Sequence, residues 1–225
     1  MAKLTNAATL EPVSISYTIG LESSKIGDAK IGKVKTTLST TEQGYAIETV
    51  TRFQGMAAII SGSNRQQACE FEVVDGKAVT TSYSGGRLKK VDYQVGFDWD
   101  KRKIDFGNDQ ILDMPEGYIV NNCVMSFAVA LLKDQGLGDV AMYSIDGIDN
   151  RIRGYKQRSR EFETIETRLG EKKVMKLVLE RELRPDRTFT FWLSPDDQYL
   201  PLKIRQSRKS RTITFEVETL ELSGS

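Results

Sequence analysis

One apolar segment, residues 121–135 (NNCVMSFAVALLKDQ), constrains the fold most, because the rest of the chain consists of short alternating stretches. Its apolar side chains recur at the three- and four-residue spacing of a helix face: Val124, Phe127, Ala128, Leu131 and Leu132. Asn121 and Asn122 can cap the start, and Gly136 is an ordinary stop signal. The pattern predicts a helix over 121–135 that must be covered by sheet, or must fill a sheet that curls around it.

The remainder of the chain is typical of β-strands. Apolar and polar residues alternate over 13–18, 91–97 and 212–218. Asp75-Gly76 and Leu169-Gly170 mark tight hairpin turns between such stretches. We count about ten to twelve strands, and a sheet of that size usually curls or closes. The prediction is a mainly β fold, a single curved antiparallel sheet or half-open barrel, with one apolar helix in or against its concave face.

Domain organisation and charge follow from the whole chain. We expect residues 1–12 to be a flexible lead-in and residues 13–221 to form a single β domain that contains the helix.

The 225 residues include 32 Lys and Arg against 31 Asp and Glu, a net charge of +1. A general nucleic-acid binder would show a strong basic excess, so we expect no nucleic-acid partner. No apolar run approaches the roughly 20 residues of a membrane-spanning helix, which leaves open only contact with a membrane surface.

Catalytic chemistry has little support in the sequence. The chain has no His, which excludes Ser-His-Asp and Cys-His catalysis and most catalytic zinc sites. The carboxylate pairs Asp98/Asp100, Asp146/Asp149 and Asp196/Asp197 fall in predicted turns, where Asp is common. Turn chemistry therefore explains them better than a glycosidase pair or a calcium site. We expect no catalytic residue, no metal and no cofactor.

The two cysteines, Cys69 and Cys123, permit one disulfide. Cysteine is among the most buried residue types, so we expect two buried free thiols, with a disulfide as the alternative.

Two features could form a ligand site. Basic runs supply candidates for a rim that meets a polar or anionic group: Arg151, Arg153, Lys156, Arg205 and Arg208. Acidic stretches follow both runs, and cross-strand pairing with these glutamates is the simpler interpretation. Aromatic residues elsewhere could line a cavity or simply pack in the core: Phe53, Trp99, Trp192 and Tyr199.

Longer motifs carry a family resemblance. They are Val91-Asp92-Tyr93, Phe97-Asp98-Trp99, the segment 112–117 (LDMPEG), Leu169-Gly170, Val174-Met175, and the segments 191–196 (FWLSPD) and 199–204 (YLPLKI). Over residues 13–220 the chain resembles the uncharacterised exported bacterial family known as domain of unknown function 3108. The resemblance implies a periplasmic protein whose signal peptide has been removed, and a curved sheet similar to lipoprotein-carrier and lipoprotein-receptor proteins. It supplies no catalytic residue, and Asn121, Asn122, Cys123 and Ser126 stand where we would expect an Asp and a Ser.

Together these features predict a non-enzymatic envelope protein that holds an apolar or amphipathic, lipid-like ligand as a carrier or sensor. Val124, Phe127, Ala128 and Leu131 would face the cavity. The alternative is an interaction module that binds an envelope protein or a glycan through its sheet surface or edge. An enzyme that uses carboxylates is the least supported option.

Overall fold

The structure, a computed structural model, describes residues 10–24, 27–55, 58, 64–107, 109–133 and 135–222. These residues form one sheet of 15 strands together with helix α2 (Met125–Leu131) and the short 3-10 helix η1 (Pro195–Asp197). The first eight strands are β1 Val13–Ser23, β2 Gly27–Thr40, β3 Tyr45–Phe53, β4 Arg65–Val74, β5 Lys77–Arg87, β6 Tyr93–Asp98, β7 Lys103–Asp105 and β8 Ile111–Asp113. The others are β9 Tyr118–Asn121, β10 Met142–Asp146, β11 Arg151–Thr167, β12 Gly170–Arg181, β13 Arg184–Ser194, β14 Leu200–Arg208 and β15 Arg211–Leu222.

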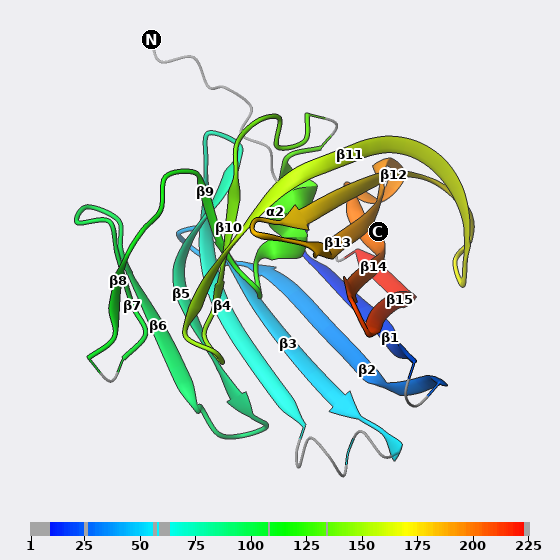
Figure 1. Cartoon of the computed structure of the whole chain (residues 1–225), viewed down its shortest axis with the longest axis horizontal. Helices are drawn as coiled ribbons and strands as arrows, with labels where there is room; N and C mark the ends of the chain where they lie inside the picture. Colours follow the sequence, from blue (N-terminus) through cyan, green and yellow to red (C-terminus); the bar gives the residue numbers. More distant parts are fainter. Residues whose placement is uncertain are drawn as a thin grey trace.

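The strands follow the spatial order β8-β7-β6-β5-β4-β3-β2-β1-β15-β14-β13-β12-β11-β10-β9. β1 pairs with both β2 and β15, so the first and last strands lie side by side within the sheet. The two edges, β8 and β9, remain separate, and the sheet curves around α2 without closing into a barrel (Figure 1). The predicted mainly β fold, with a helix against the concave face, is confirmed.

Strand number and pairing differ from the prediction. The sheet has 15 strands rather than about ten to twelve, because short strands such as β8 and the fully buried β9 show no alternation in the sequence. β9 and β10 also pair in parallel, with Tyr118 opposite Met142. Parallel neighbours need a crossover connection, and α2 supplies it here. The rest of the sheet is antiparallel between the described strands.

Helix α2 is shorter than the predicted 121–135. Asn121 ends β9, and its side-chain oxygen accepts hydrogen bonds from the amides of Cys123 at 2.8 Å and Val124 at 2.9 Å. These bonds form a turn where the helix was expected to begin. Lys133 has a φ of 48°, which stops the helix before the Gly136 signal is reached. Six of the seven residues of α2 are buried, as expected for a helix enclosed by a sheet.

The β9–α2 connection is fastened across the interior to β4 and β5. The Tyr118 hydroxyl accepts a hydrogen bond from the Ala78 amide at 2.9 Å, and the Asn121 amide donates to the Thr80 hydroxyl at 3.2 Å. A disulfide joins Cys123 to Cys69 of β4, with Cα atoms 6.4 Å apart. The expected pair of free thiols is therefore wrong, because curling of the sheet brings two cysteines 54 residues apart into contact. These links hold the β9 edge of the sheet against β4 and β5, which lie near the opposite edge.

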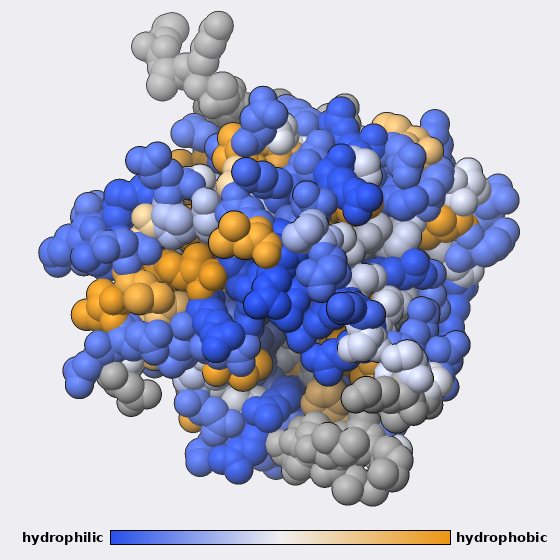
Figure 2. Space-filling model, viewed as in Figure 1, coloured by the Kyte–Doolittle hydropathy of each residue, from blue (hydrophilic) through white to orange (hydrophobic). Residues whose placement is uncertain are grey.

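The Asp75-Gly76 turn predicted from the sequence is confirmed. Asp75 and Gly76 have φ values of 50° and 73°, as a type I′ turn requires. Residues 1–9 of the expected lead-in lie outside the described residues, whereas Leu10 is buried and its amide donates to the Tyr45 hydroxyl at 3.1 Å. Among the described residues, no helix has the length and apolar character needed to cross a membrane. The face in Figure 2 is mainly hydrophilic, with apolar side chains gathered over the β6–β8 side.

Candidate functional site

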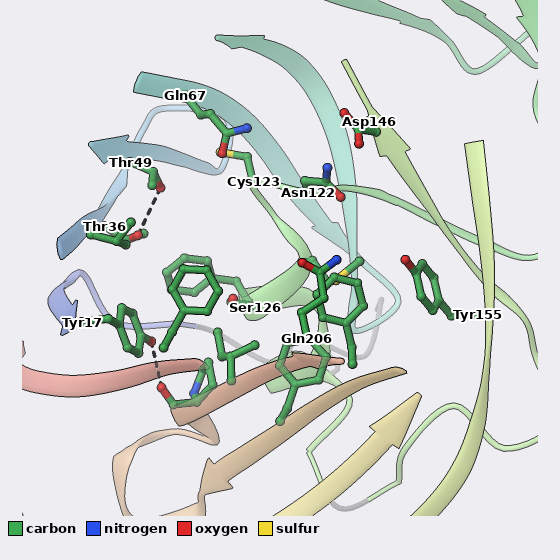
Figure 3. A pocket seen from close by; sticks show the side chains of 18 of the residues that line it. Tyr17, Thr36, Thr49, Gln67, Asn122, Cys123, Ser126, Asp146, Tyr155 and Gln206 are labelled. Carbon is green, nitrogen blue, oxygen red and sulfur yellow. Dashed lines mark hydrogen bonds between the residues drawn. The ribbon is translucent and has the colours of Figure 1, made fainter. Parts of the chain in front are cut away.

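A cavity of about 350 Å³ lies between the concave face of the sheet and the first turn of α2. Strands β1–β4 form one side and β10–β15 the other, so the cavity lies within the curl of the sheet. Figure 3 shows Thr36 and Thr49 on one side and Tyr155 across from them. Pockets for small ligands begin at about this size.

Part of the wall is apolar and largely aromatic. Its aliphatic and aromatic side chains include Ile15, Val34, Phe127, Phe191, Ile204 and Phe215. Phe189 and Phe191 stack with ring centroids 5.9 Å apart, and Tyr155 meets Phe189 edge-on at 5.3 Å. Side chains two residues apart on a strand point to the same face, so β13 contributes both phenylalanines to the cavity. This surface suits the apolar part of a ligand.

Strands β1–β4 add neutral polar groups. The hydroxyl oxygens of Thr36 and Thr49 are 3.1 Å apart, and the two residues are paired in register (Figure 3). The Tyr17 hydroxyl donates to the Pro201 carbonyl at 2.8 Å, and burial raises the pKa of Tyr17. The Gln67 amide donates to two tyrosine hydroxyls behind the wall. These groups are already partnered, which leaves this side polar but uncharged.

Cations gather on the opposite side. Arg181, Arg187 and Arg208, which we call the arginine cluster, come from three neighbouring strands, β12, β13 and β14. Arg187 precedes Thr188 and Arg208 follows Ser207, and these two neighbours are paired in register. The order Arg187, Phe189, Phe191 on β13, and Arg208, Gln206, Ile204 on β14, leads from charged to apolar along the cavity face. Two strands thus repeat the same polarity gradient.

A fourth lining arginine, Arg153, is neutralised within the protein. It forms ion pairs with Asp146 and Asp149. The Asp146 carboxylate also accepts hydrogen bonds from the backbone amides of Ile148 at 3.0 Å and Asp149 at 3.2 Å. Burial disfavours the charge of Arg153, but its bonds to the two carboxylates outweigh this and raise its pKa. Arg153 and Asp146 therefore form a closed pair.

The arginine cluster has no such counter-charge. Among the described residues, no carboxylate lies within 4.0 Å of these three guanidinium groups. The Nε atom of Arg187 is buried and has no hydrogen-bond partner. Burial first, and then neighbouring positive charges that include Arg187, lower the pKa of both Arg181 and Arg208. The cavity therefore presents uncompensated positive charge.

The family model described as "Protein of unknown function (DUF3108)" matches residues 15–218. The chain belongs to the DUF3108 family. No curated protein matches it. The DUF3108 chain is similar in structure to a β-barrel-like protein of domain of unknown function DUF1849 from Brucella abortus, with a TM-score of 0.63 at 12% identity over 96% of this chain and 99% of the other. This likeness concerns the fold alone.

A "putative outer membrane lipoprotein-sorting protein domain" from Vibrio parahaemolyticus aligns with 96% of the DUF3108 chain and 86% of its own. The identity is 9% and the TM-score is 0.33, too low to establish a shared fold.

The structure separates the predicted helix residues. Phe127 lines the cavity, together with Met125 and Ser126 of the same turn. The other three predicted residues, Val124, Ala128 and Leu131, are buried in the packed core and do not line it. The reason is that the cavity meets the start of the helix rather than one face along its length.

The four aromatic candidates, Phe53, Trp99, Trp192 and Tyr199, do not line the cavity. Phe53 is two residues beyond Thr51, where the wall on β3 ends. Trp99 stacks on Phe97, with ring centroids 6.1 Å apart, and its indole donates to the Thr80 carbonyl.

Trp192 and Tyr199 are excluded by local geometry. Trp192 alternates with Phe191, so its ring lies on the outer face of β13, where Lys203 and Arg205 cover it at 5.6 and 5.5 Å. Tyr199 follows η1, and its amide donates to the Ser194 carbonyl at 2.7 Å within that turn.

The basic candidates also divide by face. Arg153 and Arg208 line the cavity, whereas Arg151 and Lys156 are exposed on β11 and Arg205 covers Trp192 outside. Cross-strand pairing with glutamates, the interpretation favoured from the sequence, occurs on this outer face. Lys156 lies 3.5 Å from Glu182, and similar pairs join Lys176 to Glu161 and Lys203 to Glu216.

Arg181 and Arg187 line the cavity but were not among the candidates predicted from the sequence. A signal was present in β13, where Arg187, Phe189 and Phe191 alternate, but alternation alone does not tell which face of a strand turns inward. Only the curl of the sheet assigns that face to the cavity.

Proposed function

We propose that this DUF3108 protein binds a hydrophobic or amphipathic, lipid-like ligand as a carrier or sensor without catalysis. The observation that carries the proposal is the cavity of about 350 Å³ beside α2. Its aromatic and aliphatic wall suits an acyl-type chain, and its polar and cationic groups suit a head group. The ligand would lie between the two halves of the curled sheet.

The absence of catalysis is part of the proposal and rests on the state of the cavity's polar groups. Asp146 is the carboxylate of the wall, and it is held by Arg153 and by two backbone amides. The oxygens of this carboxylate are already engaged by the ion pair and the two amides, so it is poorly placed to take a proton from a ligand. The sequence contains no imidazole to take that role.

We further propose that the protein acts in the periplasm. The disulfide between Cys69 and Cys123 supports an oxidising compartment, where such bonds form and persist. Fractionation of cells that express the natural gene, with immunodetection in periplasm and cytoplasm, tests the proposal. Recovery in the cytoplasm with both thiols free would contradict it.

Native mass spectrometry of protein purified from its own cell envelope tests the function directly. Organic extraction of the same sample identifies any bound lipid. We expect a discrete additional mass that extracts as a lipid. A clean ligand-free mass with no lipid in the extract would instead favour the module that binds a protein or a glycan through its surface.

A variant links the ligand to this cavity. Phe127→Trp places a larger ring in the wall, so we expect little co-purifying lipid in a protein that remains folded. Phe162→Trp is the matched control, because Phe162 is 53% exposed on β11 and lies outside the cavity. Equal lipid content in both variants, with unchanged circular dichroism, would remove α2 from the binding site.

A further inference from the structure

We propose that the arginine cluster binds the single anionic group, a carboxylate or a phosphate, of an amphipathic ligand. The inference rests on the proposed function, because it assigns the chemical class of the head group of the ligand in that cavity. The three side chains are Arg181, Arg187 and Arg208. The natural ligand would therefore be an anionic single-headed lipid rather than a neutral one.

The charge balance of the cavity supports an external anion. Partly buried cations are costly unless they are paired, and the protein pairs the adjacent Arg153 with two carboxylates. It supplies no carboxylate within 4.0 Å to the arginine cluster among the residues described. Instead, burial first, and then the positive charges of neighbouring arginines, lower the pKa of Arg181 and Arg208. A bound anion would relieve both effects.

The donors are suited to an oxyanion. A guanidinium group presents planar, forked N–H donors that match carboxylate and phosphate oxygens in pairs. Arg187 retains a buried Nε–H with no partner inside the described protein. The three groups come from adjacent strands, whose spacing of about 4.8 Å lets neighbouring side chains reach one anion.

The polarity gradient sets the orientation of the ligand. An anion held between Arg187 and Arg208 is followed on the same faces by Phe189 and Gln206, and then by Phe191 and Ile204. A chain attached to the anion would therefore enter the apolar part of the cavity. A free inorganic anion would contact only the charged end of the cavity. Binding of a lipid head group can therefore be distinguished from binding of a free anion, because only the lipid also gains contacts in the apolar part.

Isothermal titration calorimetry with four probes separates the cases. Dodecanoate and dodecyl phosphate carry the charge and the chain, dodecanol carries only the chain, and inorganic phosphate carries only the charge. We expect both anionic amphiphiles to bind about tenfold or more tightly than dodecanol, since charge-assisted hydrogen bonds are the strong ones. We expect inorganic phosphate to bind far more weakly than dodecyl phosphate.

The double variant Arg187→Gln/Arg208→Gln assigns the effect to the cluster. Dodecanoate affinity should fall about tenfold or more, while dodecanol affinity stays unchanged. The double variant Arg158→Gln/Arg160→Gln is the matched control, because it removes the same charge from exposed positions of β11 outside the cavity. It should leave both affinities unchanged.

The outcomes separate the two proposals. If no dodecyl compound binds, the proposed function itself fails. If dodecanol binds as tightly as dodecanoate, or if both double variants act alike, the cavity still takes a lipid but the anion site is wrong. If inorganic phosphate matches dodecyl phosphate, the cluster serves a free anion and the head-group assignment is overturned.

Discussion

Two cationic clusters on opposite faces of the same sheet are built in opposite ways. On the outer face, the carboxylate of Glu218 lies 2.7 Å from Lys33, 3.1 Å from Arg168 and 3.8 Å from Lys30, and it accepts the Thr18 hydroxyl at 2.6 Å. We call this group the Glu218 cluster. On the cavity face, the arginine cluster has no carboxylate within the same distance among the described residues.

The carboxylate of Glu218 is stabilised by partners within the fold. Its side chain is 12% exposed, and hydrogen bonds from Lys33 first and then Thr18 lower its pKa to about 2. The pKa values of Arg181 and Arg208 are also lowered, but by burial and like charges, so in their case the charged form is disfavoured. Each cation of the Glu218 cluster has a carboxylate within 4.0 Å, whereas the arginine cluster has none among the described residues. The difference separates a structural cluster from a candidate site.

The largest expected effect comes from breaking the link that fixes the cavity face. Replacing both cysteines, Cys69→Ala/Cys123→Ala, should reduce the free energy of unfolding by about 4 kcal/mol, because a loop of 54 residues is no longer closed in the unfolded chain. Urea denaturation of the variant and the wild type measures this. Cys123 lines the cavity, so dodecanoate binding should weaken as well.

A reductant provides the control for that variant. Wild-type protein in dithiothreitol should match the double alanine variant, and dithiothreitol should not change the variant. Loss of the disulfide should weaken ligand binding on the cavity face and leave the Glu218 cluster on the outer face unaffected. If it also changed the salt dependence of the unfolding free energy, to which the Glu218 cluster contributes, the contrast between the two faces would be wrong.

Much of the fold could be predicted from the sequence because alternation and turn chemistry are local. The Asp75-Gly76 hairpin and the apolar helix near Phe127 were both found in this way. The parallel pair β9–β10 and the disulfide could not be, since both depend on residues that meet only after the sheet has curled. Asn121 illustrates the limit, because a side chain read as a helix cap ends a strand and also anchors it to Thr80.

The candidate site was predictable only in part. Phe127, predicted to face the cavity, lines it, and so do Arg153 and Arg208, which were predicted as candidates for a basic rim. Trp192 and Arg205 contact each other outside the cavity, and the sequence could not assign them to a face, since strand alternation defines two faces without saying which one is concave. The curvature of the sheet is a property of the whole fold, and it decides these cases.

The second expected effect concerns the Glu218 cluster. Glu218→Gln removes the only carboxylate of the defined group, so unfolding free energy at pH 7 should fall by about 1 kcal/mol, the scale of exposed charge networks. The pKa of Glu218 is lowered from 4.5 to about 2 by folding, so its stabilisation is complete above pH 4.5 and disappears as the pH falls through 2. Thermal unfolding of both proteins from pH 7 to pH 3 should show the difference shrinking.

Glu221→Gln is the control for this prediction. Glu221 lies on the same strand, β15, and is exposed, so its substitution should have little effect at any pH. A constant difference between wild type and Glu218→Gln down to pH 3 would show that the carboxylate charge is not the source of the stabilisation.

The smallest expected effect has the opposite sign and sharpens the comparison most. Arg187→Met removes one of three repelling charges and a buried, unpartnered N–H, and it keeps an unbranched apolar side chain. Ligand-free protein should therefore be unchanged or more stable by up to about 1 kcal/mol, as expected where a site is maintained at the cost of stability. Added salt should remove the gain, because it screens the repulsion in the wild type. Arg158→Met, on the exposed outer face, controls for the loss of one charge, and its guanidinium lies 4.0 Å from Glu180. Arg187→Met could instead destabilise the ligand-free protein in the way that Glu218→Gln does. The arginine cluster would then stabilise the fold, as the Glu218 cluster does, and would not be a binding site.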